Sequence, residues 1–414
     1  MAEAIDLRDP YNQELATMDV SNPELYQYGW WPQHFERLRK ESPVHYTANS
    51  AFGPFWSVTR FADIIEVEKN HEVFSSEPTV ILGDQPEDFA FVNFIQSDPP
   101  IHDEQRKVVQ PVVAPRNLAN LEGLIRQRAA NILDQLPIGE TFNWVEHVSI
   151  ELTTQMLATL FDFPFEERRK LTYWSDMAIA TEEMTGSQAI SEEERRAVMM
   201  ECYEYFCRLF EQRRNKQEGF DLLTMLANNP ATEDMPKDTM QFIGNLMLLI
   251  IGGNDTTRNS ISGGVVALNQ FPAEYEKLRA NPSLIPNMVS EIIRWQTPLS
   301  HMRRTATQDI EFKGANIRKG DKVVMWYISG NRDAEVIESP NSFIIDRADV
   351  RHHLSFGFGI HRCMGNRLAE MQLRVLWEEI MQRFNDVQVV GEIEKVRSNF
   401  IHGYTNVPVQ LQRA

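Results

Sequence analysis

Hydrophobic and polar positions along the chain predict mostly helices, with short strands near both ends. The stretches PVHYT (43–47) and FWSVT (55–59) flank a Gly-Pro turn, which predicts a β-hairpin. Helical patterns dominate from about residue 100 to 300. The sequence therefore predicts a mainly α protein with small β-sheets, an α+β fold. Its β-rich parts are expected at about 43–60, 308–330 and 385–414.

One predicted helix is much longer than the others. It starts behind Pro236 with Asp238 as its candidate N-cap and continues without proline to about Gln270. At 1.5 Å per residue such a helix is about 50 Å long. Its middle reads LLIIGGNDTTRNS, with Gly252 and Gly253 side by side, and each glycine costs a helix interior about 1 kcal/mol relative to alanine. This pattern indicates that another group presses against the helix there.

A second distinctive helix follows the stretch FGFGIHRCMGNRLAE (356–370), which carries Cys363. Glycines surround this cysteine, at Gly357, Gly359 and Gly365. Apolar residues then recur at steps of three and four: Ala369, Leu373, Leu376, Ile380 and Phe384. Cys363 is therefore expected near a helix N-terminus, where unpaired N–H groups and the helix dipole favour a thiolate.

Composition and charge place the chain among globular enzymes. It has 414 residues, 42% of them hydrophobic and 24% charged. No linker, internal repeat or low-complexity segment divides it, so a single domain over 1–414 is expected. A net charge of −18 argues against nucleic acid as a partner, because phosphates would repel the protein.

The N-terminus and the cysteines predict a cytoplasmic protein without a stable membrane anchor. The first residues, MAEAIDLRDPYNQEL, are polar and acidic, unlike a signal peptide. The longest strongly apolar run, 246–251, is far shorter than the roughly 20 residues that span a bilayer. Cys202 and Cys207 are interpreted as buried apolar residues, and with Cys363 they give no disulfide framework.

A lone cysteine is weak evidence of a site, but the residues around Cys363 are specific. The pattern Phe-x-x-Gly-x-His-x-Cys-x-Gly-x-x-Leu-Ala, from Phe356 to Ala369, resembles the heme-binding loop of the cytochrome P450 family. The resemblance implies the P450 fold, with its long central helix over a heme. It also implies heme b (iron protoporphyrin IX) as cofactor, contacted by Phe356, with Cys363 as the axial ligand of the iron.

The polar middle of the long helix resembles a second family motif, the oxygen-binding groove. The motif is filled by GGNDTT, residues 252–257. The resemblance implies that Gly252 and Gly253 make room for dioxygen beside the heme. It further implies that Thr256 and Asp255 are catalytic residues that deliver protons. The alternative is that Thr256 only donates a hydrogen bond to a carbonyl of its own helix.

Two further sets of residues match the family in order and spacing. Glu291-x-x-Arg294 resembles its structural core, with Arg347 as third member, although such a pair is common on any exposed helix. The expected partners of the heme propionates are His102, Arg106, Arg304 and His361, because two carboxylates beside an apolar ring need donors. For His102 and Arg106 the alternative is an ordinary surface charge cluster.

The family resemblance implies a monooxygenase that uses O2 and two electrons from NAD(P)H. The chain has neither a nucleotide-binding fingerprint nor a cysteine cluster. Separate proteins are therefore implied as donors, a 2Fe-2S ferredoxin and its flavin reductase. Residues 351–374 carry a local positive excess suited to an acidic ferredoxin, from Arg351, Arg362, Arg367 and Arg374 against Glu370. Alternatively, some of these arginines bind propionate or internal carboxylates.

Within the family, several strings look closest to the soluble bacterial alkane and fatty-acid ω-hydroxylases. They are LLIIGGNDTTRNS, TPLSHMRRTAT, FGFGIHRCMGNRLAEMQLR and SNFIHGYTNVP. This implies terminal hydroxylation of medium-chain linear substrates, without separating alkane from fatty acid. The residues expected to line the substrate pocket are Leu248, Ile251, Leu299, Met302, Phe400 and Ile401, although each is also an ordinary core residue type.

Three other functions share the thiolate loop. Hydroxylation of a terpenoid or steroid differs only in pocket shape, which sequence reports poorly. A peroxide-driven peroxygenase would not need Asp255 and Thr256. A non-catalytic heme-thiolate sensor predicts neither the acid–alcohol pair nor an access channel.

Overall fold

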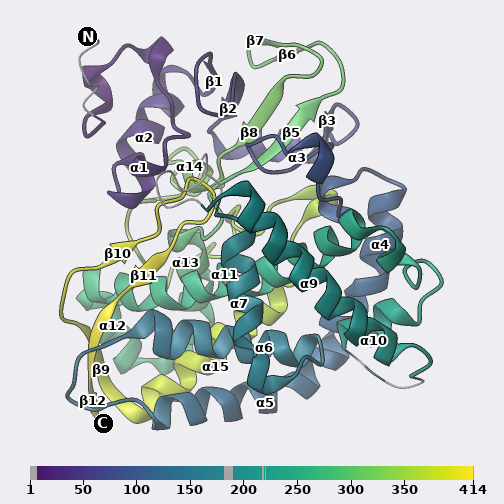
Figure 1. The fold of residues 1–414 in the computed structure, drawn as a ribbon. Coiled ribbons are helices and arrows are strands. Elements are labelled where there is room, and N and C mark those ends of the chain that lie inside the picture. The colour runs from purple at the N-terminus through teal and green to yellow at the C-terminus, as the bar shows by residue number, and fades with distance from the viewer. Residues whose placement is uncertain (1–6, 181–189, 217–218, 220, 414) are drawn as a thin grey trace.

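The structure, a computed structural model, describes residues 7–180, 190–216, 219 and 221–413. A helical body carries a β-sheet at one corner (Figure 1). The α-helices are α1 (Pro23–Gln27), α2 (Trp31–Glu41), α3 (Phe61–Lys69), α4 (Ile101–Val109), α5 (Pro115–Asp134), α6 (Glu151–Leu160), α7 (Arg169–Ala178), α9 (Glu192–Arg213), α10 (Leu222–Ala227), α11 (Thr239–Gln270), α12 (Pro272–Ala280), α13 (Ile285–Gln296), α14 (Tyr327–Gly330) and α15 (Asn366–Arg383). This architecture confirms the predicted fold class.

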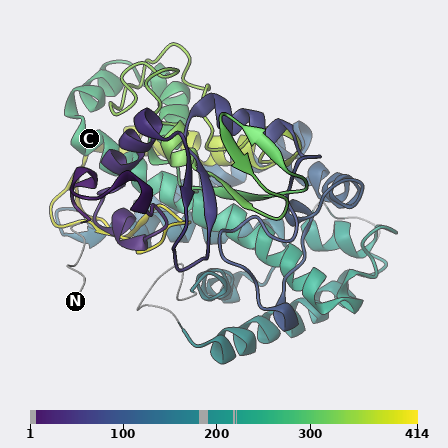
Figure 2. The same ribbon diagram turned by 90° about the horizontal axis from the view of Figure 1, so that it is seen from above.

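The strands form one larger sheet and several small ones. They are β1 (Val44–Thr47), β2 (Phe55–Val58), β3 (Phe74–Ser75), β4 (Phe142–Asn143), β5 (Met302–Ala306), β6 (Ile310–Phe312), β7 (Ala315–Ile317), β8 (Lys322–Met325), β9 (Phe384–Val389), β10 (Glu394–Lys395), β11 (Tyr404–Asn406) and β12 (Pro408–Arg413). The larger sheet has the order β1-β2-β8-β5-β3, and the smaller ones are β4-β12-β9, β10-β11 and β6-β7. Seen from above, the N-terminal strands and the green strands lie side by side (Figure 2).

The predicted hairpin is confirmed, because β1 and β2 pair antiparallel with Thr47 opposite Phe55. The second β-rich part begins earlier than predicted, at Met302, because β5 pairs with both β8 and β3. Such long-range pairing leaves little local signal. The end of that part is also different, because α14 turns the chain out of the sheet where a strand was expected. Residue 414, the end of the third predicted part, lies outside the described residues.

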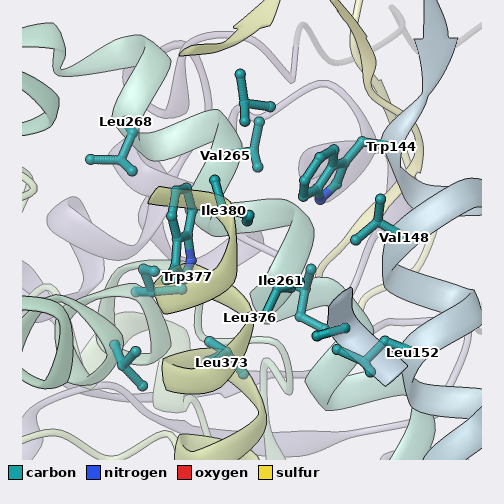
Figure 3. Close-up of a cluster of buried hydrophobic side chains, with 14 of the residues drawn as sticks. Trp144, Val148, Leu152, Ile261, Val265, Leu268, Leu373, Leu376, Trp377 and Ile380 are labelled. Atoms are coloured by element: carbon teal, nitrogen blue, oxygen red, sulfur yellow. The ribbon is translucent and has the colours of Figure 1, made fainter. Parts of the chain in front are cut away.

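The predicted long helix is α11, and its start is confirmed. The Asp238 side chain caps it by accepting a hydrogen bond from Gln241 N at 3.0 Å. Its first half, including Phe242 and Ile250, belongs to one buried apolar cluster. Its last third, including Ile261, belongs to another, in which Trp144 and Trp377 lie among the side chains around it (Figure 3). The polar middle of α11 therefore lies between two hydrophobic cores.

Helix α15 follows Cys363 as predicted, and its apolar face is buried in the second of these clusters. Phe384 was expected on that face but is the first residue of β9. Cys202 is buried in α9, whereas Cys207 is only half-buried. Five residues correspond to about 140° around a helix, so the two cysteines lie on different faces. Among the described residues, no helix is long and apolar enough to cross a membrane.

Candidate active site

A large cavity lies between the middle of α11 and the start of α15, with about 1560 Å³ of space including its mouth. Most of the site residues expected from the sequence line it: Arg106, Leu248, Gly252, Gly253, Thr256, Leu299, Met302, Arg304, Phe356, His361 and Cys363. The structure therefore brings together residues from α4, α11, β5 and the cysteine loop. Its walls are mainly apolar, and its polar lining residues include Thr256, Arg106 and Arg304.

The cysteine loop is closed by its own backbone. Cys363 N donates to Phe356 O at 2.8 Å. Gly357 and Gly359 have φ of +64° and +66°, values that side chains disfavour. At Gly359 a Cβ would also lie 2.5 Å from the backbone oxygen of Glu68 at the end of α3. The two glycines thus let the loop turn tightly against α3 and present Cys363 on the cavity wall.

The surroundings of Cys363 shift the pKa of its thiol in opposite directions. Burial raises the pKa of the thiol, whereas the N–H groups of Gly365 and Asn366 and the charges of Arg106 and Arg362 lower it. Burial is the largest of these causes, so the pKa lies above its usual value. The predicted stabilisation by N–H groups is therefore present, but it does not outweigh the opposing effect of burial. A coordinating metal ion deprotonates a thiol outright, which would complete the site.

On α11, the two adjacent glycines have different surroundings. A Cβ on Gly252 would meet nothing within 4 Å, so this residue opens onto the cavity. A Cβ on Gly253 would lie 2.9 Å from Leu157 Cδ2, so this glycine also lets α6 approach α11. Thr256 Oγ1 donates to Gly252 O at 2.8 Å. The back-bonding considered for Thr256 is therefore present, and it leaves the lone pairs of the hydroxyl available to the cavity.

Asp255 is close to Thr256 in sequence, but its side chain does not line the cavity. The carboxylate is fully buried against α7, where Ser175 Oγ donates to Oδ2. Arg258 Nη2 lies 2.7 Å from Asp255 Oδ1 and 2.8 Å from Asp176 Oδ1, and thus bridges the two acids. Burial raises the pKa of Asp255 to about 6, with Arg258 opposing it and Asp176 adding to it.

The four expected propionate partners gather at one edge of the site. The His102 and His361 rings are 4.4 Å apart between centroids. His361 Nε2 lies 2.8 Å from Ser76 Oγ, while His361 Nδ1 and His102 Nε2 are buried without a partner. Burial lowers the pKa of both histidines. Arg106 Nη2 donates to the backbone oxygen of Arg362.

Sequence analysis missed Glu68, which lines the same edge of the cavity from α3. Its Oε2 lies 3.0 Å from Arg304 Nη2, and its Oε1 accepts a hydrogen bond from the Tyr327 hydroxyl. Both Glu68 and Arg304 are buried. No motif surrounds Glu68 in the sequence, so only the fold shows that this acid meets Arg304.

These surroundings fit a heme. His361 Nδ1 and His102 Nε2 are buried without a partner. A propionate oxygen would accept a hydrogen bond from His361 Nδ1, and from His102 Nε2 when that ring carries both protons, because His102 Nδ1 already faces Asp103 Oδ1 at 2.7 Å. Arg106 and Arg304 supply positive charge at the same edge. The mainly apolar walls suit a flat hydrophobic ring, and the Cys363 sulfur faces the same space. A heme in this cavity would therefore be held at its edge by these four residues and at its iron by Cys363.

The predicted structural core is formed, and it is deeply buried. Arg294 donates to Glu291 through Nε at 2.7 Å and through Nη2 at 2.8 Å. Arg347 Nε donates to Glu291 Oε2 at 3.2 Å. Arg294 also donates to three backbone carbonyls, those of Asn331, Pro340 and Ser342. The interpretation of an exposed helix pair is therefore wrong, because Glu291 and Arg294 are 0% exposed.

The expected substrate pocket is only partly formed by the residues named from the sequence. Leu248, Leu299 and Met302 line the cavity, whereas Ile251, Phe400 and Ile401 do not. Phe400 and Ile401 form a separate small cluster with partly buried neighbours that include Leu299. The apolar wall that sequence analysis missed includes Phe94, Ile95, Leu222 and Leu249.

The arginines of residues 351–374 are not equivalent. Arg374 is paired with Glu122 at 2.9 Å and with Glu378 at 2.8 Å. It therefore fits the alternative of an internal partner. Arg351, Arg362 and Arg367 are exposed.

Comparisons with known proteins agree with this geometry. A family model described as Cytochrome P450 matches residues 32–401. The solved structure of cytochrome P450-153 from Novosphingobium aromaticivorans is 45% identical, with a TM-score of 0.89 over 95% of this chain and 99% of that one. Linalool 8-monooxygenase of Pseudomonas putida is 38% identical over 95% of this chain and 98% of its own. Methyl-branched lipid omega-hydroxylase of Mycobacterium bovis is 29% identical over 91% and 90%.

Proposed function

We propose that this chain, which belongs to the cytochrome P450 family, hydroxylates the terminal carbon of medium-chain n-alkanes or fatty acids. The observation that carries the proposal is the joint lining of one mainly apolar cavity by Cys363, Thr256 and a wall that includes Leu248, Leu249 and Leu299. A heme bound through a cysteine thiolate supplies the chemistry that inserts one atom of O2 into a C–H bond.

The proposed roles of the protein groups follow from their positions. Cys363 ligates the iron, and the N–H groups of Gly365 and Asn366 tune the sulfur by donating toward it. Gly252 leaves space on α11 for dioxygen. The Thr256 hydroxyl donates to Gly252 O and accepts hydrogen bonds from the cavity side. Asp255 takes up and releases the protons that Thr256 passes on, and it must turn away from Ser175 to do so.

The substrate class is inferred from the shape of the wall and from the relatives. Hydroxylation at a chain end requires that only this end reach the reactive centre, because a primary C–H bond is stronger than a secondary one. The apolar side chains that face the cavity from α11 and β5 suit an alkyl chain and offer it no charged anchor. Similarity to a protein named methyl-branched lipid omega-hydroxylase supports this choice.

The electrons are proposed to come from NAD(P)H through a flavin reductase and a 2Fe-2S ferredoxin. The ferredoxin is proposed to dock near the cysteine loop, where Arg351, Arg362 and Arg367 are exposed. Opposite charge on an acidic partner would steer it to this face.

The second candidate is hydroxylation of a terpenoid or steroid. It is favoured by the similarity to a protein named linalool 8-monooxygenase and, at 31% identity, to one named steroid C26-monooxygenase. Both candidates use the same residues near the heme and differ in the apolar wall.

An optical titration of the ferric protein decides between them. The probes are n-octane, dodecanoic acid, a monoterpene and a steroid, and the measured quantity is the shift of the Soret band as substrate displaces the iron-bound water. Shifts with the two linear probes alone support the proposal, and the position of the hydroxyl in the product then tests terminal attack. A shift with the terpene or steroid alone would discard the linear substrate and retain the monooxygenase.

A further inference from the structure

The segment 90–96 crosses α11 near its beginning and lies in direct backbone contact with it. Val92 N donates to Met240 O at 3.3 Å. Gly244 lies against this crossing, where a Cβ would be 2.2 Å from Val92 O and 2.9 Å from Val92 N. Main-chain atoms cannot turn aside as a flexible side chain can. Glycine at 244 is therefore what allows the segment to approach the helix so closely.

Asn245 fixes the same crossing with its side chain. Its Oδ1 accepts a hydrogen bond from Phe94 N at 3.3 Å. Its Nδ2 donates to Gln241 O at 3.0 Å and to Gln105 Oε1 on α4 at 3.3 Å. Asn245 is 3% exposed, and a buried amide left without partners is costly. This one side chain thus joins α11, α4 and the segment in a single arrangement.

The far side of the segment forms part of the cavity wall. Phe94 and Ile95 line the cavity together with Leu248, while Gly244 and Asn245 do not. Leu248, Gly252 and Thr256 are four residues apart and line the cavity together, whereas Gly244 lies about 120° round α11 from Thr256 and faces the crossing segment. The crossing lies about 12 Å from Gly252 along the helix axis. The position of the crossing therefore sets where Phe94 and Ile95 stand in the wall of the cavity that Thr256 also lines.

We propose that Gly244 and Asn245 determine substrate specificity by docking the segment 90–96 against α11. They act as positioning residues, because they hold Phe94 and Ile95 close to α11 and so keep the cavity narrow. We expect the two residues to favour the binding of linear over bulky ligands, and this direction rests on the proposed function. That the two residues control the relative affinity of narrow and wide ligands does not depend on it.

The test compares Gly244→Ala and Asn245→Ala with Gly123→Ala in the heme-loaded, full-length protein. Gly123 is the matched control, because it lies within α5 and a Cβ there would meet nothing within 4 Å. The dissociation constant for dodecanoic acid is measured from the Soret shift and that for a steroid from its competition with dodecanoic acid, and thermal unfolding checks that each variant is folded.

In Gly244→Ala, the dissociation constant for dodecanoic acid divided by that for the steroid is expected to rise by about tenfold or more. A change of that size is equivalent to the loss of at least one buried hydrogen bond. Asn245→Ala should raise this ratio of dissociation constants by a smaller factor, and Gly123→Ala should leave the ratio unchanged. An unchanged ratio in folded Gly244→Ala overturns the proposal. If that variant does not fold, an unchanged ratio in Asn245→Ala overturns it.

Failure of the proposed function gives a different result. The wild-type protein would then bind the monoterpene or the steroid but not dodecanoic acid. The ratio between the monoterpene and the steroid would still be measured in the same variants, and it should still change in Gly244→Ala and Asn245→Ala but not in Gly123→Ala.

Discussion

The buried carboxyl group of Asp255 should make the stability of the protein depend on pH in a way that Asp255→Asn removes. Burial raises the pKa of Asp255 from 3.8 to about 6. At 1.36 kcal/mol per pKa unit, keeping the group ionised in the folded protein costs on the order of 3 kcal/mol. The folded state therefore binds this proton more tightly than the unfolded state does.

The sign of the effect follows from proton linkage. The favourable contribution of Asp255 is fully present below pH 3.8 and is lost as the pH rises through about 6. Between pH 5.5 and 7.5 the loss amounts to about 0.8 kcal/mol for a pKa of about 6.

The assay is denaturant unfolding of the wild type and of Asp255→Asn at several pH values across this range. The free energy of unfolding of the variant minus that of the wild type should rise by about 0.8 kcal/mol from pH 5.5 to 7.5. Asp176→Asn is the matched control, because it removes the other acid paired with Arg258. Asp176→Asn should keep most of the pH dependence of the free energy of unfolding, because burial is the largest cause of the raised pKa of Asp255. A difference that stays constant with pH would refute the reasoning.

Three further outcomes are expected. Glu291→Gln should lower the free energy of unfolding by about 3–5 kcal/mol in a urea titration, because it leaves Arg294 buried without its anion. Asp309→Asn, which breaks an exposed pair with Arg318, should lower it far less, and equal losses would contradict the role of burial. Cys363→Ala should lose the thiolate-type ferrous-CO band, and a normal band would exclude Cys363 as the ligand. Arg362→Glu should slow ferredoxin-supported reduction at low salt and little at high salt; a rate that ignores salt would remove the proposed docking face.

The features that were predicted well from the sequence depend on residues that lie within a few positions of one another. The loop around Cys363 needs glycines within a few positions of the sulfur, and the structure gives two of them positive φ. Glu291 and Arg294 are one helical turn apart, so they meet wherever the helix lies. The cap of α11 is likewise local, because Asp238 bonds to a residue three positions on.

The features that sequence missed depend on the rotation of helices or on distant contacts. Leu248 and Ile251 are both apolar residues of α11, yet only Leu248 faces the cavity. Asp255 was expected to point to the site but is held by α7, which the local pattern does not report. Glu68 meets Arg304 across a separation of 236 residues. Periodicity shows that a residue has a buried face but not which neighbour that face meets.

The two hydrophobic cores along α11 have a consequence for the order in which the protein folds. One core contains Phe242 to Ile250 and the other begins at Ile261, while polar residues that include Asn254, Asn259 and Ser260 are buried between them. We expect each core to collapse as its own cooperative unit, because apolar burial drives collapse. The segment that carries Thr256 acquires its surroundings only when the two units dock. We therefore expect the proposed catalytic centre to form when the two units dock and to be lost when they separate.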